Sequence, residues 1–292
     1  MIDYDFLTAS SLETALDYLN DFKDVMVIAG GTDVLVNLHN KSKRLPKIAH
    51  LLNINNINSL KYIYPQDHHV EIGPLVTHSE LIDEPLIEKR FPILLQAASY
   101  IGSTQIRNRG TIGGNICNAS PAADLLPPLL ALNAELVLSE KREDRIVPLK
   151  NFLTAPYQTV LRQQELLTKI RIPFNNKDYY MHFQKIGRRK ALSISRLNLA
   201  VVAKIDEKEI FQDVRVVPGS ATPYPQRLSE VEKMINGQSI HQINLEEVSR
   251  LTSEELVSIT GTRWSTPYKK PVICTLIQRA LKQIIKEKTE NE

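Results

Sequence analysis

The chain has 292 residues, a length that allows two or three folded domains. Its composition, 42% hydrophobic and 24% charged, is typical of a globular protein and excludes a largely disordered one. Its formal net charge of +3 is too small to indicate a nucleic-acid partner, because proteins that neutralise many phosphates usually carry a concentrated basic face. No run of about 18 uncharged apolar residues occurs, and no basic segment leads into an apolar core at the N-terminus. The sequence therefore predicts a soluble cytoplasmic protein with neither a membrane span nor a nucleic-acid partner.

The N-terminal segment predicts a helix, then a buried strand, then a glycine turn. Ser10 and Glu13 have the spacing of a capping box, and apolar residues recur on one helical face as far as about Asn20. The short β-branched run VMVIA, residues 25–29, stops at a pair of adjacent glycines, Gly30-Gly31.

Alternating or β-branched segments predict further strands, and helical periods predict further helices. Thr77 and Glu80 form a second capping-box pattern, residues 91–103 carry a broad apolar helical face that ends at Gly102, and residues 271–288 follow the helical period. The other predicted strands are 47–54, 68–76, two strands within 134–149, 165–173, 198–206 and 213–219.

The polar and aromatic segment FNNKDYY, residues 174–180, is the predicted domain boundary. We expect an N-terminal domain over residues 1–175, itself divided into subdomains of about 1–55 and 56–175, and a smaller C-terminal domain over residues 176–292.

A second glycine-rich stretch, GTIGGNICNASPAADLLPPLL, occupies residues 110–130. Glycine permits positive φ and exposes its amide without a β-carbon, so two such loops can present N–H donors to one anionic ligand such as a diphosphate. Both pairs can equally be tight turns without a ligand. Neither matches the Rossmann fingerprint or the P-loop, so a nucleotide bound here would be held in another way.

These segments together resemble a known family. AGGTDVLV, TIGGNICNASPAADLLPPLLAL, ELLTKIRIP and FQKIGRRKALSISRLNLAVV are similar to the FAD-binding medium subunit of molybdenum hydroxylases, the group of bacterial xanthine dehydrogenase and carbon monoxide dehydrogenase. The resemblance runs through the whole chain. It implies an α+β fold in which a two-subdomain FAD-binding domain, similar to that of vanillyl-alcohol oxidase, precedes a smaller α+β domain.

The resemblance implies FAD as cofactor, with its diphosphate against the two glycine loops, an acidic residue on its sugar part, and an apolar and a basic residue near the flavin. The matching positions in this sequence are Ala29, Gly30, Gly31, Thr32, Asp33, Val34, Ile101, Gly110, Thr111, Gly113, Gly114, Asn115, Asp124 and Lys185, with Leu161 and Leu192 as weaker matches.

Several of these residues have simpler interpretations. Ile101 can be a core residue of the 91–103 helix, and Asp33 can cap a helix. Lys185, Arg188, Arg189 and Lys190 can form a solvated basic face, or they can approach the FAD phosphates or a dinucleotide acceptor. Cys117 is expected to be a small buried hydrophobe without a redox role. His68 and His69 would point to opposite faces of a strand and have no third partner at ligand spacing, so no metal site is predicted.

An FAD subunit of this kind needs no catalytic residue of its own, because the flavin carries the chemistry and the protein orients it. Two cysteines, Cys117 and Cys274, cannot hold an iron–sulfur cluster that takes four thiolates, so the electrons must come from outside the chain. The resemblance implies a small subunit with two [2Fe-2S] clusters and a large subunit with a molybdenum cofactor, assembled as a heterotrimer, and NAD+ or another acceptor. A self-sufficient FAD-dependent reductase of the same fold and a cofactor-free interaction subunit stay open as alternatives.

Overall fold

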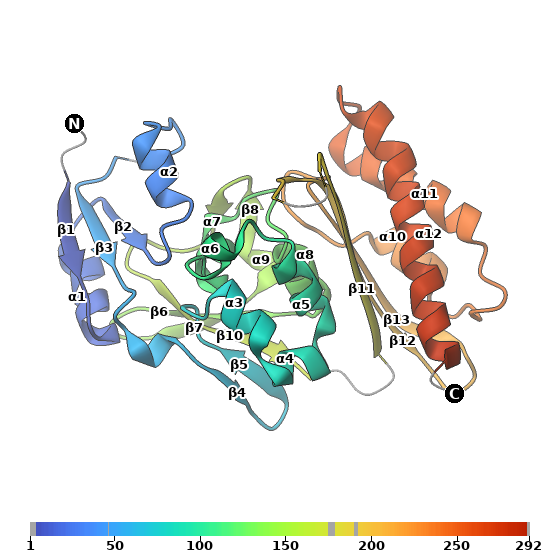
Figure 1. The fold of residues 1–292 in the computed structure, drawn as a ribbon, viewed down its shortest axis with the longest axis horizontal. Helices are drawn as coiled ribbons and strands as arrows, with labels where there is room; N and C mark the ends of the chain where they lie inside the picture. Colours follow the sequence, from blue (N-terminus) through green and yellow to red (C-terminus); the bar gives the residue numbers. More distant parts are fainter. Residues whose placement is uncertain (1–3, 46, 175–178, 190–191, 291–292) are drawn as a thin grey trace.

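The structure, a computed structural model, describes residues 4–45, 47–174, 179–189 and 192–290. Three main sheets follow one another along the chain, and helices cover each of them (Figure 1). The predicted α+β class is confirmed. Within the described residues, no helix combines the length and the apolar character that crossing a membrane requires.

The N-terminal region is a parallel three-stranded sheet in the order β1–β3–β2. The predicted capping box at Ser10 is wrong by one residue, because Ser11 has the extended backbone of an N-cap and its hydroxyl accepts a hydrogen bond from Thr14 N at 3.1 Å. The elements are β1 (Asp5–Thr8), α1 (Leu12–Asp21), β2 (Val25–Ile28), α2 (Val34–His39) and β3 (His50–Asn53), followed by a short 3₁₀ turn (Asn58–Leu60).

The middle region is built on an antiparallel five-stranded sheet in the order β4–β5–β10–β6–β7, with a small β8–β9 pair beside it. The strands are β4 (Ile63–Pro65), β5 (His69–Ile72), β6 (Glu135–Ser139), β7 (Asp144–Pro148), β8 (Leu153–Ala155), β9 (Gln158–Thr159) and β10 (Leu166–Pro173). The helices are α3 (His78–Asp83), α4 (Pro85–Arg90), α5 (Pro92–Ser99), α6 (Thr104–Arg107), α7 (Ile112–Asn118), α8 (Leu126–Ala131) and α9 (Leu149–Phe152).

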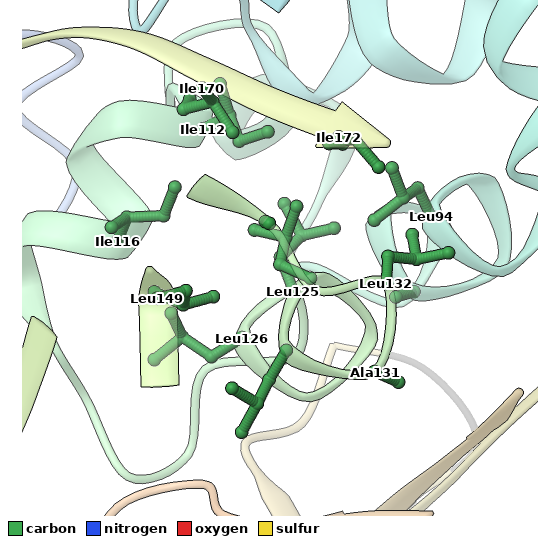
Figure 2. Packing of buried hydrophobic residues seen from close by; sticks show 14 of the residues in the cluster. Leu94, Ile112, Ile116, Leu125, Leu126, Ala131, Leu132, Leu149, Ile170 and Ile172 are labelled. Carbon is green, nitrogen blue, oxygen red and sulfur yellow. The ribbon is translucent and has the colours of Figure 1, made fainter. Parts of the chain in front are cut away.

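Apolar side chains from these helices and from β10 form the largest core of the molecule. Figure 2 shows Leu94 of α5, Ile112 and Ile116 of α7, and Ile170 and Ile172 of β10 converging on one interior. Burial of this much apolar surface is the main force that fixes the helices against the sheet. The core also fixes the segments that join these helices, and the predicted site residues Ile101, Gly110, Thr111 and Asp124 lie in those segments.

Two helix predictions in this region have different outcomes. The capping box of Thr77 and Glu80 is confirmed, with both of its hydrogen bonds present at the start of α3. The predicted helix over 91–103 is too long, since α5 ends at Ser99 and Gly102 takes a left-handed φ of 44°. The apolar pattern continues past the point where the backbone turns, so periodicity alone could not locate the end.

The C-terminal region is an antiparallel sheet in the order β11–β12–β13 with helices on one face (Figure 1). Its elements are β11 (Tyr179–Gly187), β12 (Ser195–Ile205), β13 (Phe211–Gly219), α10 (Ser229–Ile235), α11 (Leu245–Thr260) and α12 (Thr266–Glu290). Of the predicted boundary segment 174–180, residues 175–178 lie outside the described residues.

Strand β12 is buried on both faces. Its side chains alternate, so that Ala200 and Val202 join the large core of the middle region while Leu199 and Val201 join the core under α11 and α12. The even-numbered positions of β12 therefore face the helices of the middle region. This alternation places polar Asn198 on that same side.

Candidate cofactor-binding site

The two glycine stretches, far apart in the sequence, meet in the structure. A β-carbon built on Gly30 would lie 1.8 Å from the carbonyl oxygen of Arg109 and 3.0 Å from the Cα atom of Gly110. No side chain fits between two backbones at that distance, so glycine at position 30 is required by a close approach.

The first stretch forms the loop between β2 and α2. Gly31 has a φ of 74°, the left-handed conformation that favours glycine, and the side chain of Leu35 lies over it. The backbone N–H groups of Gly30, Gly31 and Thr32 donate no hydrogen bond to another described residue. We call these three residues the first glycine loop. They present a group of unused donors next to the second stretch.

The remaining residues of this motif flank the loop. Ala29 follows β2, and its carbonyl accepts a 2.6 Å hydrogen bond from Asn55 Nδ2. Asp33 occupies the N-cap position of α2 and Val34 is its first residue, but the Asp33 side chain does not cap the helix. Its carboxylate instead accepts from Asn37 Nδ2 at 2.7 Å. The expectation that Asp33 caps this helix through its side chain is therefore wrong.

The second stretch begins a helix rather than a turn. Thr111 is the N-cap of α7, and its hydroxyl accepts from Gly114 N at 3.0 Å. Gly113 N donates to the Pro74 carbonyl at 2.9 Å, and a β-carbon on Gly113 would lie 2.7 Å from that same oxygen. The expectation that this pair offers free N–H donors is therefore wrong, because the fold itself uses both amides.

Asn115 follows in the first turn of α7. Its backbone N–H donates to the Thr111 carbonyl. Its side-chain oxygen Oδ1, in contrast, is buried and has no hydrogen-bond partner among the described residues. A buried polar atom without a partner is uncommon and is characteristic of sites that bind a ligand or water. Gly114 is exposed beside it, and a β-carbon there would meet only Thr111 Oγ1.

Asp124 and Lys185 form a buried ion pair between the middle and C-terminal regions. Lys185 Nζ lies 2.6 Å from Asp124 Oδ2 and also donates to the Tyr100 carbonyl at 3.0 Å. Burial raises the pKa of the Asp124 carboxyl above its ordinary value, while the Lys185 ammonium and a hydrogen bond from Asn198 oppose that rise. Three segments of the chain are tied together at this carboxylate.

Ile101 follows α5 directly after Tyr100. It is half-buried and packs against the large core, and its carbonyl accepts a 3.1 Å hydrogen bond from Arg107 Nη1. The simpler interpretation of Ile101 as a core residue therefore holds, although the residue also adjoins the Lys185 contact. The prediction that Ile101 lies within a helix is wrong, since α5 ends two residues earlier, at Ser99.

A cavity of about 980 Å³ opens between the segment after α5 and the end of β11. Lys185 and Leu192 line it, but Leu161 is not among its lining residues. A run of small and polar residues after Gly102 was a signal for part of this lining. The lining residues other than Lys185 and Leu192 were not predicted as site residues, except that Arg189 was named in the basic group after Lys185. They are Ser99, Tyr100, Gly102, Ser103, Thr104, Gln105, Arg107, Ile186, Gly187, Arg189 and Ser193.

Short helix α6 joins the cavity to the contact between the glycine stretches. Arg107, its last residue, lines the cavity, and Gly110 N donates to the Ile106 carbonyl at 2.7 Å. Behind Gly110 lies the buried imidazole of His78, and burial together with the Arg107 charge lowers its pKa to about 4. The segment from Arg107 to Gly110 thus connects the wall of the cavity to the contact between the glycine stretches.

The basic and thiol groups near the motif show no sign of a redox or metal role among the described residues. Arg189 lines the cavity and donates to the Leu192 carbonyl, while Lys190 lies outside the described residues. Burial raises the pKa of the Cys117 thiol to about 12, far from the reactive range. Among the residues that the structure describes, no three His, Cys, Asp or Glu side chains gather as a metal site would require.

A nucleotide with a diphosphate fits this arrangement. The first glycine loop offers unused N–H donors, the Asn115 oxygen lacks a partner, and the cavity beyond α6 is large enough for a ring system. These are the features expected of a site for FAD.

Comparison with protein families assigns the chain to a class. The FAD binding domain in molybdopterin dehydrogenase matches over residues 2–175, and the CO dehydrogenase flavoprotein C-terminal domain matches over residues 182–284. The chain belongs to this family of FAD-binding subunits of molybdenum hydroxylases, and the resemblance drawn from its motifs is confirmed. It is an oxidoreductase subunit whose cofactor is FAD.

Individual relatives are similar over almost their full length. The xanthine dehydrogenase FAD-binding subunit of Escherichia coli O157:H7 is 30% identical over 280 residues, which cover 95% of this chain and 94% of that protein. The glyceraldehyde dehydrogenase medium chain of Sulfolobus acidocaldarius is 29% identical, with 97% and 98% covered. A solved carbon monoxide dehydrogenase from Hydrogenophaga pseudoflava has a TM-score of 0.88 at 25% identity, with 97% of both chains covered.

Proposed function

We propose that this chain holds FAD between the first glycine loop and the cavity, and that it passes electrons from an iron–sulfur partner to a separate acceptor. The observation that carries the proposal is the approach of Gly30 to Arg109 and Gly110 beside unused N–H donors. Concentrated backbone N–H groups of this kind bind phosphate oxygens.

The residues have different roles in holding FAD. The amides of Gly30, Gly31 and Thr32 would donate to the diphosphate, and the Asp124 carboxylate would accept hydrogen bonds from hydroxyls of the ribityl or ribose part. Neither Gly113 nor Gly114 would supply donors, because their amides are used within the fold. Gly113 permits the close approach of Pro74, whereas exposed Gly114 would leave room for the cofactor. The complete set is Ala29, Gly30, Gly31, Thr32, Asp33, Val34, Ile101, Gly110, Thr111, Gly113, Gly114, Asn115, Asp124 and Lys185.

Bound FAD supplies a ring that exchanges electrons singly or in pairs. The chain's own contribution is to bind that ring, to orient it and to limit its contact with water in the cavity. Lys185 keeps a positive charge at the cavity wall, where it is paired with Asp124. We assign no residue as a catalytic acid or base.

The electrons are proposed to come from partner subunits. Two cysteines in the whole chain are too few for a thiolate-ligated cluster, and the similar proteins are named as subunits or medium chains. We infer a heterotrimer with a small subunit that carries two [2Fe-2S] clusters and a large subunit that carries the molybdenum cofactor. NAD+ is the first acceptor to test.

Anaerobic reduction tests this function. The complex, purified with its partners, should lose flavin absorbance at about 450 nm when a substrate of the large subunit is added, and NAD+ should restore it. Purine, nicotinate, an aldehyde and CO form the substrate panel. The isolated FAD-loaded chain should not respond to any of them. Reduction of the isolated chain by a substrate would instead indicate a self-sufficient reductase.

A further inference from the structure

Asn198 is a fully buried amide in the middle of an apolar strand. Its side chain is 0% exposed on β12, where its neighbours Leu197 and Leu199 are also completely buried. Burying an amide is unfavourable unless its polar atoms are paired, so its presence here needs a reason. The reason lies on the face of β12 that packs against the middle region.

The Asn198 amide holds one of the two oxygens of Asp124. Nδ2 donates to Asp124 Oδ1 at 3.0 Å, while Lys185 Nζ lies 2.6 Å from Oδ2. Lys185 and Asn198 are direct cross-strand partners on β11 and β12. Two adjacent strands of the C-terminal sheet therefore each contact one oxygen of the carboxylate, β11 through the Lys185 ammonium and β12 through the neutral Asn198 amide.

The amide has one permitted orientation. Its Oδ1 is buried without a partner among the described residues, which is the cost of pointing Nδ2 at Asp124. Exchanging the two atoms would set a carbonyl oxygen against a carboxylate oxygen, which is repulsive. A hydrogen bond donated to this oxygen stabilises the ionised carboxylate, so the Asn198 orientation opposes the rise in the Asp124 pKa that burial causes.

The neighbouring strand is shaped to make room for this amide. Gly219 of β13 is the cross-strand partner of Asn198, and a β-carbon on Gly219 would lie 2.1 Å from Asn198 Oδ1 and 2.6 Å from Pro127 Cγ. Gly219 does not have a positive φ, so space and not backbone conformation excludes a side chain.

We propose that Asn198, in the space left by Gly219, is a positioning residue that orients the Asp124 carboxylate toward the FAD. This inference rests on the proposed role of Asp124 in holding the cofactor. Lys185 alone would leave the carboxylate free to rotate about its single contact, whereas the second donor fixes both oxygens. Asp124 can then offer its remaining lone pairs in one direction.

Three variants test the proposal in the FAD-free chain. Asn198→Asp keeps the shape but replaces the donor with a second carboxylate, Asn198→Ala removes the donor without adding charge, and Gly219→Ala displaces the amide from the other strand. The control is Thr252→Val, an isosteric change at a fully buried residue of α11 whose hydroxyl bonds the Val248 carbonyl. Each chain is titrated with FAD, and thermal unfolding and the visible circular dichroism of the bound flavin are recorded.

A positioning role predicts at least a tenfold weaker FAD affinity and an altered visible dichroism in all three variants, with neither change in Thr252→Val. A purely structural role would lower the unfolding temperature of the variants and the control alike and would leave the flavin signal unchanged, which would overturn the proposal. If Asn198→Asp fails to fold, Asn198→Ala decides the question by the same two measurements. Wild-type chain that binds no FAD would instead refute the proposed function itself.

Discussion

Replacement of Gly30 by alanine tests the contact between the two glycine stretches. The added β-carbon would lie 1.8 Å from the Arg109 carbonyl oxygen and 2.6 Å from its carbon, and both of these atoms belong to the backbone. One of the loops must therefore move by about 1.6 Å before an ordinary van der Waals contact is restored. A flexible side chain could have rotated away at little cost, but a backbone carbonyl cannot.

This displacement should weaken FAD binding more than it weakens the fold. Overpacking of this kind costs about 1–3 kcal/mol of unfolding free energy. Hydrogen bonds to a charged group contribute about 1.5–3 kcal/mol each, so loss of two donors from the first glycine loop would cost about 3–6 kcal/mol of binding. The dissociation constant for FAD should then rise by about 10²- to 10⁴-fold.

Titration of the FAD-free chain with FAD, followed by flavin fluorescence, measures the effect, and far-ultraviolet circular dichroism checks the fold. Gly237→Ala is the matched control, because Gly237 has a φ of 84° but no atom within 4 Å of an added β-carbon. It imposes backbone strain without a collision at the site. Wild-type affinity in a folded Gly30→Ala chain would refute the reasoning, because the loop contact would then be irrelevant to the cofactor.

Two further predictions concern the residues around the second glycine stretch. Gly114→Val should abolish flavin retention in the purified chain, because it places a β-branched side chain against the proposed diphosphate position. The FAD-free fold should stay intact, because position 114 is exposed and an added β-carbon meets only Thr111 Oγ1 at 3.0 Å. An unchanged flavin-to-protein ratio would contradict this prediction. The pKa of His78 is about 4 in the folded chain, below its ordinary value of 6.5, so the unfolded chain takes up the proton first as the pH falls. The free energy of unfolding should therefore fall by about 3 kcal/mol in total as the pH drops from 6.5 to about 4. Denaturant titrations at several pH values should show a fall that is smaller by about 3 kcal/mol in His78→Gln than in the wild type, because His182 and several carboxyls with lowered pKa values titrate in both chains. Equal falls in the two chains would count against a buried neutral imidazole at position 78.

Local sequence rules predicted those parts of the site that depend on neighbours in the chain. The capping box of Thr77 and Glu80 was predictable because both of its partners lie within one helical turn. The strand before Gly30 was predictable from its β-branched run and the glycines that end it. The family resemblance of the motifs then indicated which glycines to examine together.

The separate reasons for each glycine could not be predicted, because they depend on contacts across the fold. Gly31 is required by its backbone conformation, Gly30 by the Arg109 carbonyl, and Gly113 by Pro74. In sequence all three belong to similar Gly-Gly pairs. Only the assembled structure separates a glycine that turns the chain from one that permits two backbones to touch.

The same limit applies to the Asn198 amide that bonds Asp124, through which both regions would act on the cofactor in the proposed site. Asn198 lies in a run whose alternation predicts a strand, and nothing local distinguishes it from a polar residue at a strand edge. Its significance comes from Asp124 in the middle region and Gly219 on β13, both distant in sequence. Since Lys185 on β11 reaches the same carboxylate, any shift of the C-terminal sheet relative to α8 would disturb both donors together. The position of that sheet, and not only the glycine motifs of the N-terminal half, thus sets the geometry of the site.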